Sequence, residues 1–419
     1  MNDLENRLSR TLTGAAGRAP HAPGTLARAV EARYRRRRQR GRALLAAAAV
    51  VVLAGGTSHA LLGEDVRAVP ATSATTAATS DEARLMALPE PIERAWPGAV
   101  RKIPARMPDG RAFQPLAFLD ERTLLVTTQQ RSEVADAVHA YDLESGDLRK
   151  IANVPTSEGA ALFSSGFTVG AGQVVWWTNL EDGRTQIWSV PLAGGEARVV
   201  DTIERSGPDT QGVDGLAVTG DRVVFSVNAG GVFAVPLGGG TAKPVEGGAG
   251  LHLLSWPWAG TVDMRGPQEP QFGTIRNLET GETRTALVRP GEKEVTCGLT
   301  VCIGWAADGT AFHRSRDGSR EKASPCGPSI PPGRFCATVV GSDRRPLGVA
   351  LYDTTTGKAA DLGIRPAEGS TATTGTATTK GTIGTGPRVI WTPRIEGDQP
   401  LLSYLVGDTR YVVDLRKIG

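Results

Sequence analysis

The sequence predicts an all-β fold, a β-propeller, preceded by a single transmembrane helix and a short, partly helical cytoplasmic segment. Three observations lead to this prediction. A strand–turn–strand phrase recurs along residues 115 to 419 at a near-constant spacing. The 419 residues include 52 Gly and 27 Pro, and Val, Thr and Trp occur in short runs between them, which is typical of strands and turns. The stretch from Ala43 to Leu62 is apolar and long enough to span a bilayer.

Residues 1–42 are predicted to be a cytoplasmic, Arg-rich segment. Leu4, Leu8 and Leu12 recur every four residues, so a helix over this stretch carries one narrow apolar stripe. The stripe buries too little surface to fold alone, and one interpretation is that it docks onto a cytoplasmic protein, since a topology signal needs no such stripe. The alternative is that the segment only sets the membrane topology and contacts anionic lipid through its Arg residues.

Residues 43–62 are predicted to be the transmembrane helix. A cluster of Arg between Arg33 and Arg42 precedes the stretch, whereas Glu64 and Asp65 follow it. Positive residues stay on the cytoplasmic side, so the N-terminus is expected inside and the rest of the chain outside. The alternative is a cleaved secretory signal ending near Ala60, which predicts a secreted protein. Both interpretations export the rest of the chain.

Residues 63–97 are predicted to be a flexible linker, because Ala, Thr and Ser dominate them without a periodic apolar face. The propeller is expected over 98–419. We expect it to close by pairing a strand near Val100 to Ile103 with the C-terminal stretch from Tyr411 to Lys417.

The recurring phrase consists of two strands around a Gly-containing turn. Clear copies run from Ala137 to Val154, Thr185 to Val200 and Gly230 to Val245, and weaker copies begin at Gly273, Gly348 and Leu401. Anchored on Tyr141, Ser189 and Ala234, the first spacings are 48 and 45 residues. Another strand pair precedes several copies, so each repeat holds four strands. This period predicts seven blades, or six if residues 365 to 400 are one insertion; a β-sandwich pair explains the alternation but not the period.

Two features resemble known families. The run Trp305-Ala306-Ala307-Asp308-Gly309-Thr310 and the Gly-Gly turns after Val190 and Val235 resemble the WD40-like repeats of TolB-type propellers. This resemblance implies a propeller and leaves its function open. The overall layout is also similar to that of actinobacterial membrane proteins associated with extracytoplasmic-function sigma factors. That second resemblance implies a role in transmembrane signalling or sigma-factor regulation.

All four cysteines lie after the predicted span. They are Cys297, Cys302, Cys326 and Cys336. An even number of cysteines in an exported domain favours two disulfides. Three pairings are possible, and proximity in the sequence favours joining Cys297 to Cys302 and Cys326 to Cys336. A four-cysteine zinc site is the alternative, but its usual paired knuckles are missing.

No catalytic residue, metal ligand or cofactor site is predicted. The five histidines are His21, His59, His139, His252 and His313, and no two stand at ligand spacing. The candidate carboxylates are Asp120, Glu121, Glu181, Asp182, Asp214, Asp221 and Asp308, and most occupy turns, where Asp accepts backbone hydrogen bonds. Trp256 and Trp258 bracket Pro257 and are predicted to stack on a sugar or peptide if exposed.

The charge distribution excludes a nucleic-acid partner for the exported part. Residues 1–42 carry a balance of +8 against +3 for the complete chain, which leaves −5 for the remainder. Phosphate binding needs a clustered basic surface. The sequence therefore predicts a non-enzymatic binding or sensing module at the cell membrane, with an unknown protein or carbohydrate ligand. The alternative is an exported enzyme acting on glycans, a hydrolase or lyase.

Overall fold

The computed structural model describes most of the predicted propeller. It covers residues 85–107, 109–131, 134–155, 161–204, 212–262, 270–328, 332–342, 345–366, 375–376, 391–393 and 400–419. The predicted cytoplasmic segment, the docking stripe of Leu4, Leu8 and Leu12, and the predicted span lie outside the described residues. Across the described ranges, no helix is both long and apolar enough to cross a membrane.

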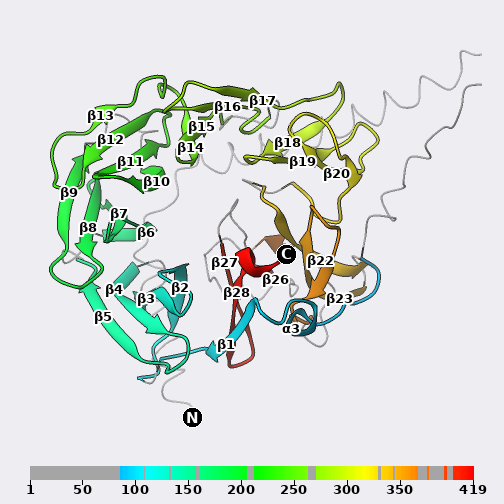
Figure 1. The fold of residues 1–419 in the computed structure, drawn as a ribbon, viewed down its shortest axis with the longest axis horizontal. Coiled ribbons are helices and arrows are strands. Elements are labelled where there is room, and N and C mark those ends of the chain that lie inside the picture. The colour runs from blue at the N-terminus through cyan, green and yellow to red at the C-terminus, as the bar shows by residue number, and fades with distance from the viewer. Residues whose placement is uncertain are drawn as a thin grey trace, which may run out of the picture. The chain divides into compact units, whose positions relative to one another are not determined.

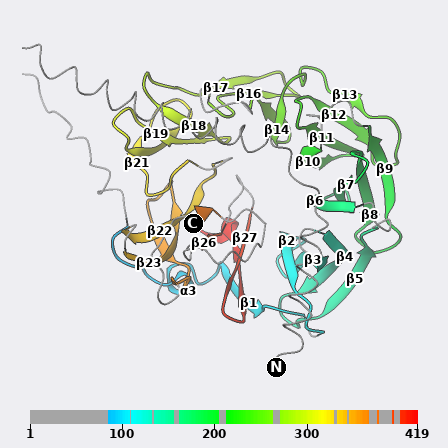
Figure 2. The ribbon, with the colours of Figure 1, turned by 180° about the vertical axis from the view of Figure 1, so that it is seen from behind.

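Seven sheets follow one another around a ring, as Figure 1 shows from one side and Figure 2 from behind. Blade 1 contains β2 (Phe113–Phe118), β3 (Thr123–Arg131), β4 (Val134–Asp142) and β5 (Leu148–Asn153). Blade 2 contains β6 (Ala161–Gly170), β7 (Gln173–Leu180), β8 (Thr185–Pro191) and β9 (Arg198–Ile203). Blade 3 contains β10 (Val213–Thr219), β11 (Arg222–Val227), β12 (Val232–Pro236) and β13 (Lys243–Pro244).

The remaining blades complete the ring. Blade 4 contains β14 (His252–Ser255), β15 (Trp258–Gly260), β16 (Thr274–Asn277) and β17 (Thr283–Thr285). Blade 5 contains β18 (Lys293–Cys297), β19 (Val301–Trp305), β20 (Ala311–Ser315) and β21 (Lys322–Ala323). Blade 6 contains β22 (Phe335–Ser342), β23 (Arg345–Asp353) and β24 (Ala359–Asp361), and blade 7 contains β27 (Leu401–Val406), β28 (Thr409–Asp414) and β1 (Val100–Pro104). The short elements are α3 (Ile92–Ala95), η1 (Leu415–Lys417) and the parallel pair β25 (Gly375–Thr376) and β26 (Trp391–Thr392).

One backbone hydrogen bond recurs in all seven blades and fixes the repeat. The residue after the third strand of the four-strand pattern donates its N–H to the carbonyl of the residue before the second strand. In blades 6 and 7 the second and third strands of the pattern are β22 with β23 and β27 with β28. The pairs are Leu143 to Arg122, Leu192 to Gly172, Leu237 to Asp221, Leu278 to Pro257, Arg316 to Thr300, Thr354 to Arg334 and Leu415 to Pro400, at 2.7 to 3.1 Å. Seven such bonds confirm seven blades, and the six-blade alternative is wrong.

The ring closes as the sequence predicts. β1 pairs antiparallel with β28, with Val100 opposite Val413 and Pro104 opposite Thr409. The outermost strand of blade 7 therefore comes from the N-terminal side of the propeller and its neighbours from the C-terminus. Because both ends of the domain share one sheet, opening the ring requires breaking that whole ladder of hydrogen bonds.

Two kinds of turn follow the third strands. In blades 1 and 6 an Asp side chain accepts a backbone N–H two residues ahead, Glu144 to Asp142 at 2.8 Å and Thr355 to Asp353 at 2.9 Å. Blade 2 instead uses Gly194 and Gly195, both at positive φ, a conformation that costs Gly little. The N–H of Gly195 reaches the carbonyl of Ile151 in the preceding blade, at 3.2 Å. The Gly-Gly turn thus joins neighbouring blades.

The innermost strands come close together where the blades converge. A Cβ atom on Gly215 would lie 2.7 Å from the Cβ of Leu253 on the next inner strand, so only Gly fits there. Each of β2, β6, β10, β14 and β18 carries a register shift against its neighbour in the sheet. β-Bulges re-aim side chains, and these bulges set the direction of the residues at the inner rim.

Candidate functional site at the inner rim

Polar side chains stand at the starts of the innermost strands of three neighbouring blades. Asp214 is the second residue of β10, His252 is the first of β14 and Glu294 is the second of β18. Figure 1 shows β10 and β14 at the inner side of the ring. Equivalent strands of a propeller run in the same direction, so these three residues lie at the same end of the ring. We call Asp214, Ser226, His252, Glu294 and Trp305 the rim cluster.

Asp214 is the centre of the rim cluster in blade 3. It occupies the register shift between Val213 and Gly215, so the bulge turns its side chain out of the ladder. The hydroxyl of Ser226 donates to Asp214 Oδ1 at 2.5 Å, and the other carboxylate oxygen contacts Nδ1 of His252. The Asp214 side chain is 26% exposed. The carboxylate is therefore held by two neighbours and still reaches solvent.

His252 joins blade 4 to blade 3 through this contact. Its side chain is 8% exposed and its Nδ1 faces the carboxylate, which favours the tautomer with the proton on Nδ1. A carboxylate in this position orients an imidazole for proton transfer at Nε2. Ser226 cannot serve as a nucleophile here, because its hydroxyl donates to Asp214, accepts the N–H of Leu253 at 2.9 Å and is fully buried. The arrangement is thus a His–Asp pair, without the serine of a hydrolase triad.

Glu294 extends the rim cluster into blade 5. Its φ is 51°, an unfavourable value for a residue with a Cβ, at the register shift of β18. Its side chain accepts the indole N–H of Trp305 at 3.3 Å. Trp305 is half-buried, with its outer ring edge near Gly327. An aromatic ring beside a carboxylate is an arrangement that can bind a sugar or a cationic group.

Three of the other candidate carboxylates are engaged in turns, and Glu121, Glu181 and Asp221 are exposed. Asp120, Asp182 and Asp308 each accept the backbone N–H two residues ahead, at 2.8 to 3.0 Å. The backbone hydrogen bonds hold the pKa of Asp120 and that of Asp308 below their usual value, and for Asp182 the side chain of Arg184 lowers the pKa most, followed by its backbone N–H. A cleft of about 480 Å³ beside blade 1 includes Asp120 and Asp142. Backbone hydrogen bonds from Ser145 and Glu144 lower the pKa of Asp142 to about 2. These acids stabilise turns.

The predicted stacking residues lie in blade 4 with their own partners. Trp256 packs against the core between blades 3 and 4, and its indole N–H donates to Glu279 at 3.2 Å. The guanidinium of Arg284 lies 4.2 Å from the ring centroid of Trp258 and covers one of its faces. Both Trp side chains are half-buried. The structure therefore leaves only part of each ring available to a ligand.

The four cysteines form two disulfides, Cys297–Cys302 and Cys326–Cys336, the pairing that their spacing favours. The first closes the turn between β18 and β19, and the second joins the segment before blade 6 to β22. In the described part of the chain no cysteine is free, and no group of three or more His, Cys, Asp or Glu is arranged to hold a metal ion.

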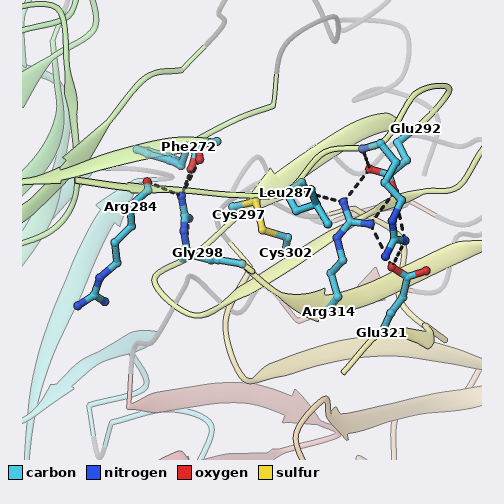
Figure 3. Close-up of a disulfide and its surroundings, with 12 residues drawn as sticks. Phe272, Arg284, Leu287, Glu292, Cys297, Gly298, Cys302, Arg314 and Glu321 are labelled. Atoms are coloured by element: carbon cyan, nitrogen blue, oxygen red, sulfur yellow. Dashed lines mark hydrogen bonds and ion pairs between the residues drawn. A yellow bond between two sulfur atoms is a disulfide. The ribbon is translucent and has the colours of Figure 1, made fainter. Parts of the chain in front are cut away.

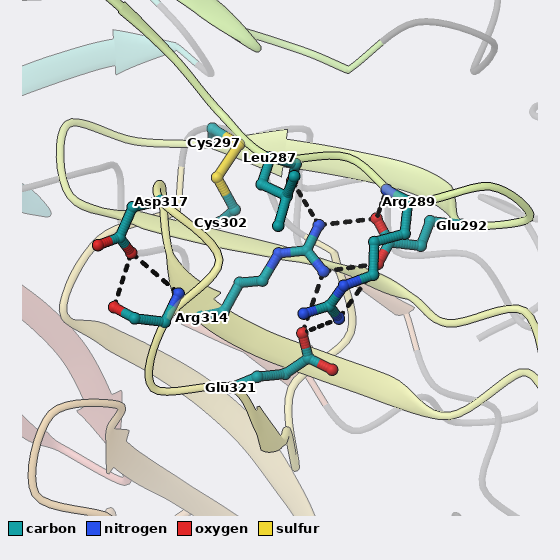
Figure 4. A network of polar contacts seen from close by, with 9 residues as sticks. Leu287, Arg289, Glu292, Cys297, Cys302, Arg314, Asp317 and Glu321 are labelled. Atoms are coloured by element: carbon teal, nitrogen blue, oxygen red, sulfur yellow. Dashed lines mark hydrogen bonds and ion pairs between the residues drawn. A yellow bond between two sulfur atoms is a disulfide. The ribbon is translucent and has the colours of Figure 1, made fainter.

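Arg314 is buried opposite Cys302 of the first disulfide, as Figure 3 shows. Arg314 has no exposed side-chain surface and bonds both oxygens of Glu292, at 2.5 and 2.7 Å, and Glu321 at 3.1 Å. Figure 4 shows Arg289 completing this network through Glu321. Burial opposes the charge of Glu292, but the hydrogen bonds from Arg314 outweigh it and lower the pKa of the carboxyl. The network ties the β17–β18 loop to β20.

Arg316 is buried differently. It bonds only backbone carbonyls, those of Gly298 at 2.7 Å, Phe272 at 2.9 Å and Gly273 at 2.7 Å. Burial, with a smaller effect of Arg284, lowers its pKa to about 10. Because its partners lie in blades 4 and 5, Arg316 joins these two blades.

The sequence pattern singles out Asp214 among the carboxylates but does not relate His252, Glu294 and Trp305 to it as members of one site. His252 and Asp214 stand 38 residues apart, and nothing local relates them. A signal that could have related them is that each stands at the start of the first strand of its blade, in successive repeats. His139 and His313 are buried in blades 1 and 5, where burial lowers the pKa of each imidazole.

No known protein family and no curated protein matches this chain. Among solved structures it is similar to an oligogalacturonate lyase from Vibrio parahaemolyticus, with 11% identity and a TM-score of 0.44 over 75% of this chain and 97% of that one. It is also similar to an uncharacterized protein from Listeria monocytogenes EGD-e, with 11% identity and a TM-score of 0.40 over 73% and 93%. A putative TolB from Agrobacterium tumefaciens has 11% identity and a TM-score of 0.31 over 54% and 87%.

Proposed function

We propose that this protein is a membrane-anchored, extracytoplasmic β-propeller that binds a ligand at the rim cluster and acts as a sensing module. The observation that carries the proposal is the exposed carboxylate of Asp214, held by Ser226 and His252 at the inner end of blades 3 and 4. Asp120, Asp182 and Asp308 accept backbone amides of their own turns, whereas Asp214 is held by side chains at the start of an inner strand and reaches solvent.

Two further observations support an extracytoplasmic location. Disulfides persist in oxidising compartments, and the propeller has two. The Arg cluster from Arg33 to Arg42 stands on the N-terminal side of the apolar stretch, which favours a cytoplasmic N-terminus. The layout similar to that of sigma-factor-associated membrane proteins extends the proposal to transmembrane signalling, with the stripe of Leu4, Leu8 and Leu12 as the cytoplasmic contact.

Fusions of reporters test the location. An alkaline phosphatase fused after Gly419 is expected to be active, and the full-length chain is expected to sediment with membranes. A soluble mature form beginning near Leu61 would show that the apolar stretch is a cleaved signal and not a membrane anchor. An inactive fusion on a membrane-bound chain would overturn the orientation.

Ligand capture tests the rim cluster. The full-length protein is screened against cell-wall glycan fragments and cell-wall peptides. Asp214→Asn and Glu294→Gln are expected to weaken binding of any hit at least about tenfold, since each removes a charged hydrogen-bond acceptor. Asp308→Asn is the matched control, because it changes a turn carboxylate outside the cluster. Equal loss in the control, or no loss in the rim variants, contradicts this site.

A glycan-cleaving enzyme is the second candidate, and the His252–Asp214 pair favours it because such a pair can transfer a proton. An enzyme converts the bound glycan into shorter products, and His252→Gln abolishes the conversion because it removes the imidazole of the pair. A binding module returns the glycan intact. Chromatography of the ligand after incubation with the wild-type protein separates the two.

The cytoplasmic contact has its own test. Residues 1–42 serve as bait, and Leu8→Asp in the same bait is expected to abolish capture of a protein partner, since it places a charge in an apolar contact. Identical captured proteins with both baits would leave the segment only a topological role.

A further inference from the structure

Exposed apolar side chains gather at one end of blades 6 and 7. The described residues include seven large hydrophobic side chains that are strongly exposed, and four of them lie here: Met86 at 57%, Leu88 at 39%, Leu347 at 41% and Leu405 at 48%. Leu347 follows the β22–β23 turn by two residues, and Leu405 precedes the β27–β28 turn by one. These two turns are equivalent, so both residues lie at the same end of neighbouring blades.

The segment that enters the propeller builds this surface. The carbonyl of Leu85 accepts the N–H of Gly341 at 2.7 Å, and that of Glu90 accepts the N–H of Asp361 at 2.9 Å. A methyl group of Leu88 lies 3.1 Å from the position a Cβ would take on Gly348, so Leu88 sits directly on the backbone of β23. Residues 85 to 90 are thus fixed along blade 6 while Met86 and Leu88 remain exposed.

Basic groups border the surface. Arg345 begins β23 and is exposed. Arg365 lies 2.8 Å from the same Cβ position on Gly348, pairs with Asp361 and keeps 44% of its side chain exposed. Apolar side chains bordered by Arg form a surface that can adsorb to an anionic lipid bilayer.

We propose that the end of blades 6 and 7 that carries Met86, Leu88, Leu347 and Leu405 rests on the lipid bilayer in which the chain is anchored. The predicted span ends at Leu62, 23 residues before Leu85. At about 3.5 Å per residue the propeller stays within about 80 Å of the bilayer. Blade 6 is the first part of the propeller that the chain from the membrane reaches. This inference rests on the membrane anchor of the proposed function.

Site-specific labelling tests the contact in the full-length protein. Leu88→Cys, Leu347→Cys and Val199→Cys are each labelled with an environment-sensitive fluorophore and reconstituted into vesicles that contain phosphatidylglycerol and a nitroxide-labelled lipid. Val199 is the matched control, because it is 39% exposed, as Leu88 is, and lies on blade 2. Quenching is expected to be at least about twofold stronger at 88 and 347 than at 199. Equal quenching at all three positions overturns the proposal.

Flotation separates failure of the contact from failure of the anchor. A chain that floats with its vesicles but shows no selective quenching keeps the anchor and loses the contact. A chain that does not float has no membrane anchor. Quenching measured after adding that chain to preformed vesicles then tests the lipid contact by itself. The variant Leu88→Ser with Leu347→Ser is expected to reduce quenching at residue 86, labelled through Met86→Cys, to the level at 199. If the double Ser variant loses a self-associated species while quenching at residue 86 is unchanged, the surface binds a second copy of the chain. That result overturns the lipid proposal.

Discussion

Blades 2 and 5 have the same four-strand pattern but are held together by different forces. Blade 2 packs Trp176 and Val174 against blade 1, and Val175 and Ile187 against blade 3, all without exposed surface. The corresponding apolar cluster of blade 5 has five buried residues, and two of them are the cysteines of one disulfide. Blade 5 adds the buried network of Arg314 and Glu292 and the carbonyl-bonded Arg316. A blade with few large apolar side chains is stabilised here by covalent and ionic links.

The comparison predicts that the largest loss of stability comes from emptying the core of blade 2. Trp176→Ala removes a fully buried indole that stacks on Phe167 and Trp188. The free energy of unfolding is expected to fall by roughly 3 to 5 kcal/mol. Urea unfolding of the wild-type and variant proteins measures it. A loss below about 1 kcal/mol would mean that blade 2 does not depend on this core.

In blade 5 the matching change removes a charge. Arg314→Met leaves Glu292, which is 5% exposed, without its main partner, and stability is expected to fall by about 3 kcal/mol. The double variant Arg314→Met with Glu292→Met removes both charges and is expected to recover most of this loss. Unfolding of the single and double variants gives the coupling. Additive losses would show that the pair is not coupled.

The disulfides are expected to contribute less. Replacing Cys326 and Cys336 by Ala opens a loop of 10 residues and is expected to cost about 2.7 kcal/mol, and replacing Cys297 and Cys302 opens one of 5 and costs about 2 kcal/mol. The fold is expected to survive both changes, as circular dichroism will show. Peptide mapping of the unreduced protein by mass spectrometry checks the pairing itself, and a peptide that joins Cys297 or Cys302 to Cys326 or Cys336 would refute it.

The smallest predicted effect is the dependence of stability on pH. It is expected to differ between the blades that contain buried carboxylate–Arg pairs and blade 2. The pKa of Glu292 and that of Asp353 are lowered in the folded protein, because hydrogen bonds from Arg314 and Arg334 outweigh the cost of burial. Their stabilisation is therefore complete above the ordinary values of 4.5 and 3.8 and is lost as pH falls through the folded-state pKa. Hydrogen exchange at pH 7 and at about pH 2.5, below both ordinary values, is expected to show loss of protection in blades 5 and 6 before blade 2. Uniform loss across all blades would contradict this order.

The repeated phrase predicted most of the architecture, for a local reason. Each copy carries its own turn chemistry, such as Asp142 before a Gly at 146 and Gly194-Gly195 in blade 2, and these turns form from neighbouring residues alone. The Cys spacings are local in the same way, and both disulfides form within a few residues of sequence. The expected closure of the ring through β1 and β28 is confirmed because only one partner was left for each end strand.

The sequence by itself determined the local elements of this protein, which are many of the strands, the turns and the period of the repeat, and it favoured the pairing of nearby cysteines. Only the tertiary structure decided which side chains of different blades meet. Asp214 and His252 are brought together by the convergence of β10 and β14, and Arg314 and Glu292 by the path of the β17–β18 loop. Leu88 meets Gly348 because the entering segment lies along blade 6. The physical reason is that strand and turn preferences act over a few residues, whereas contacts between blades depend on the geometry of the closed ring.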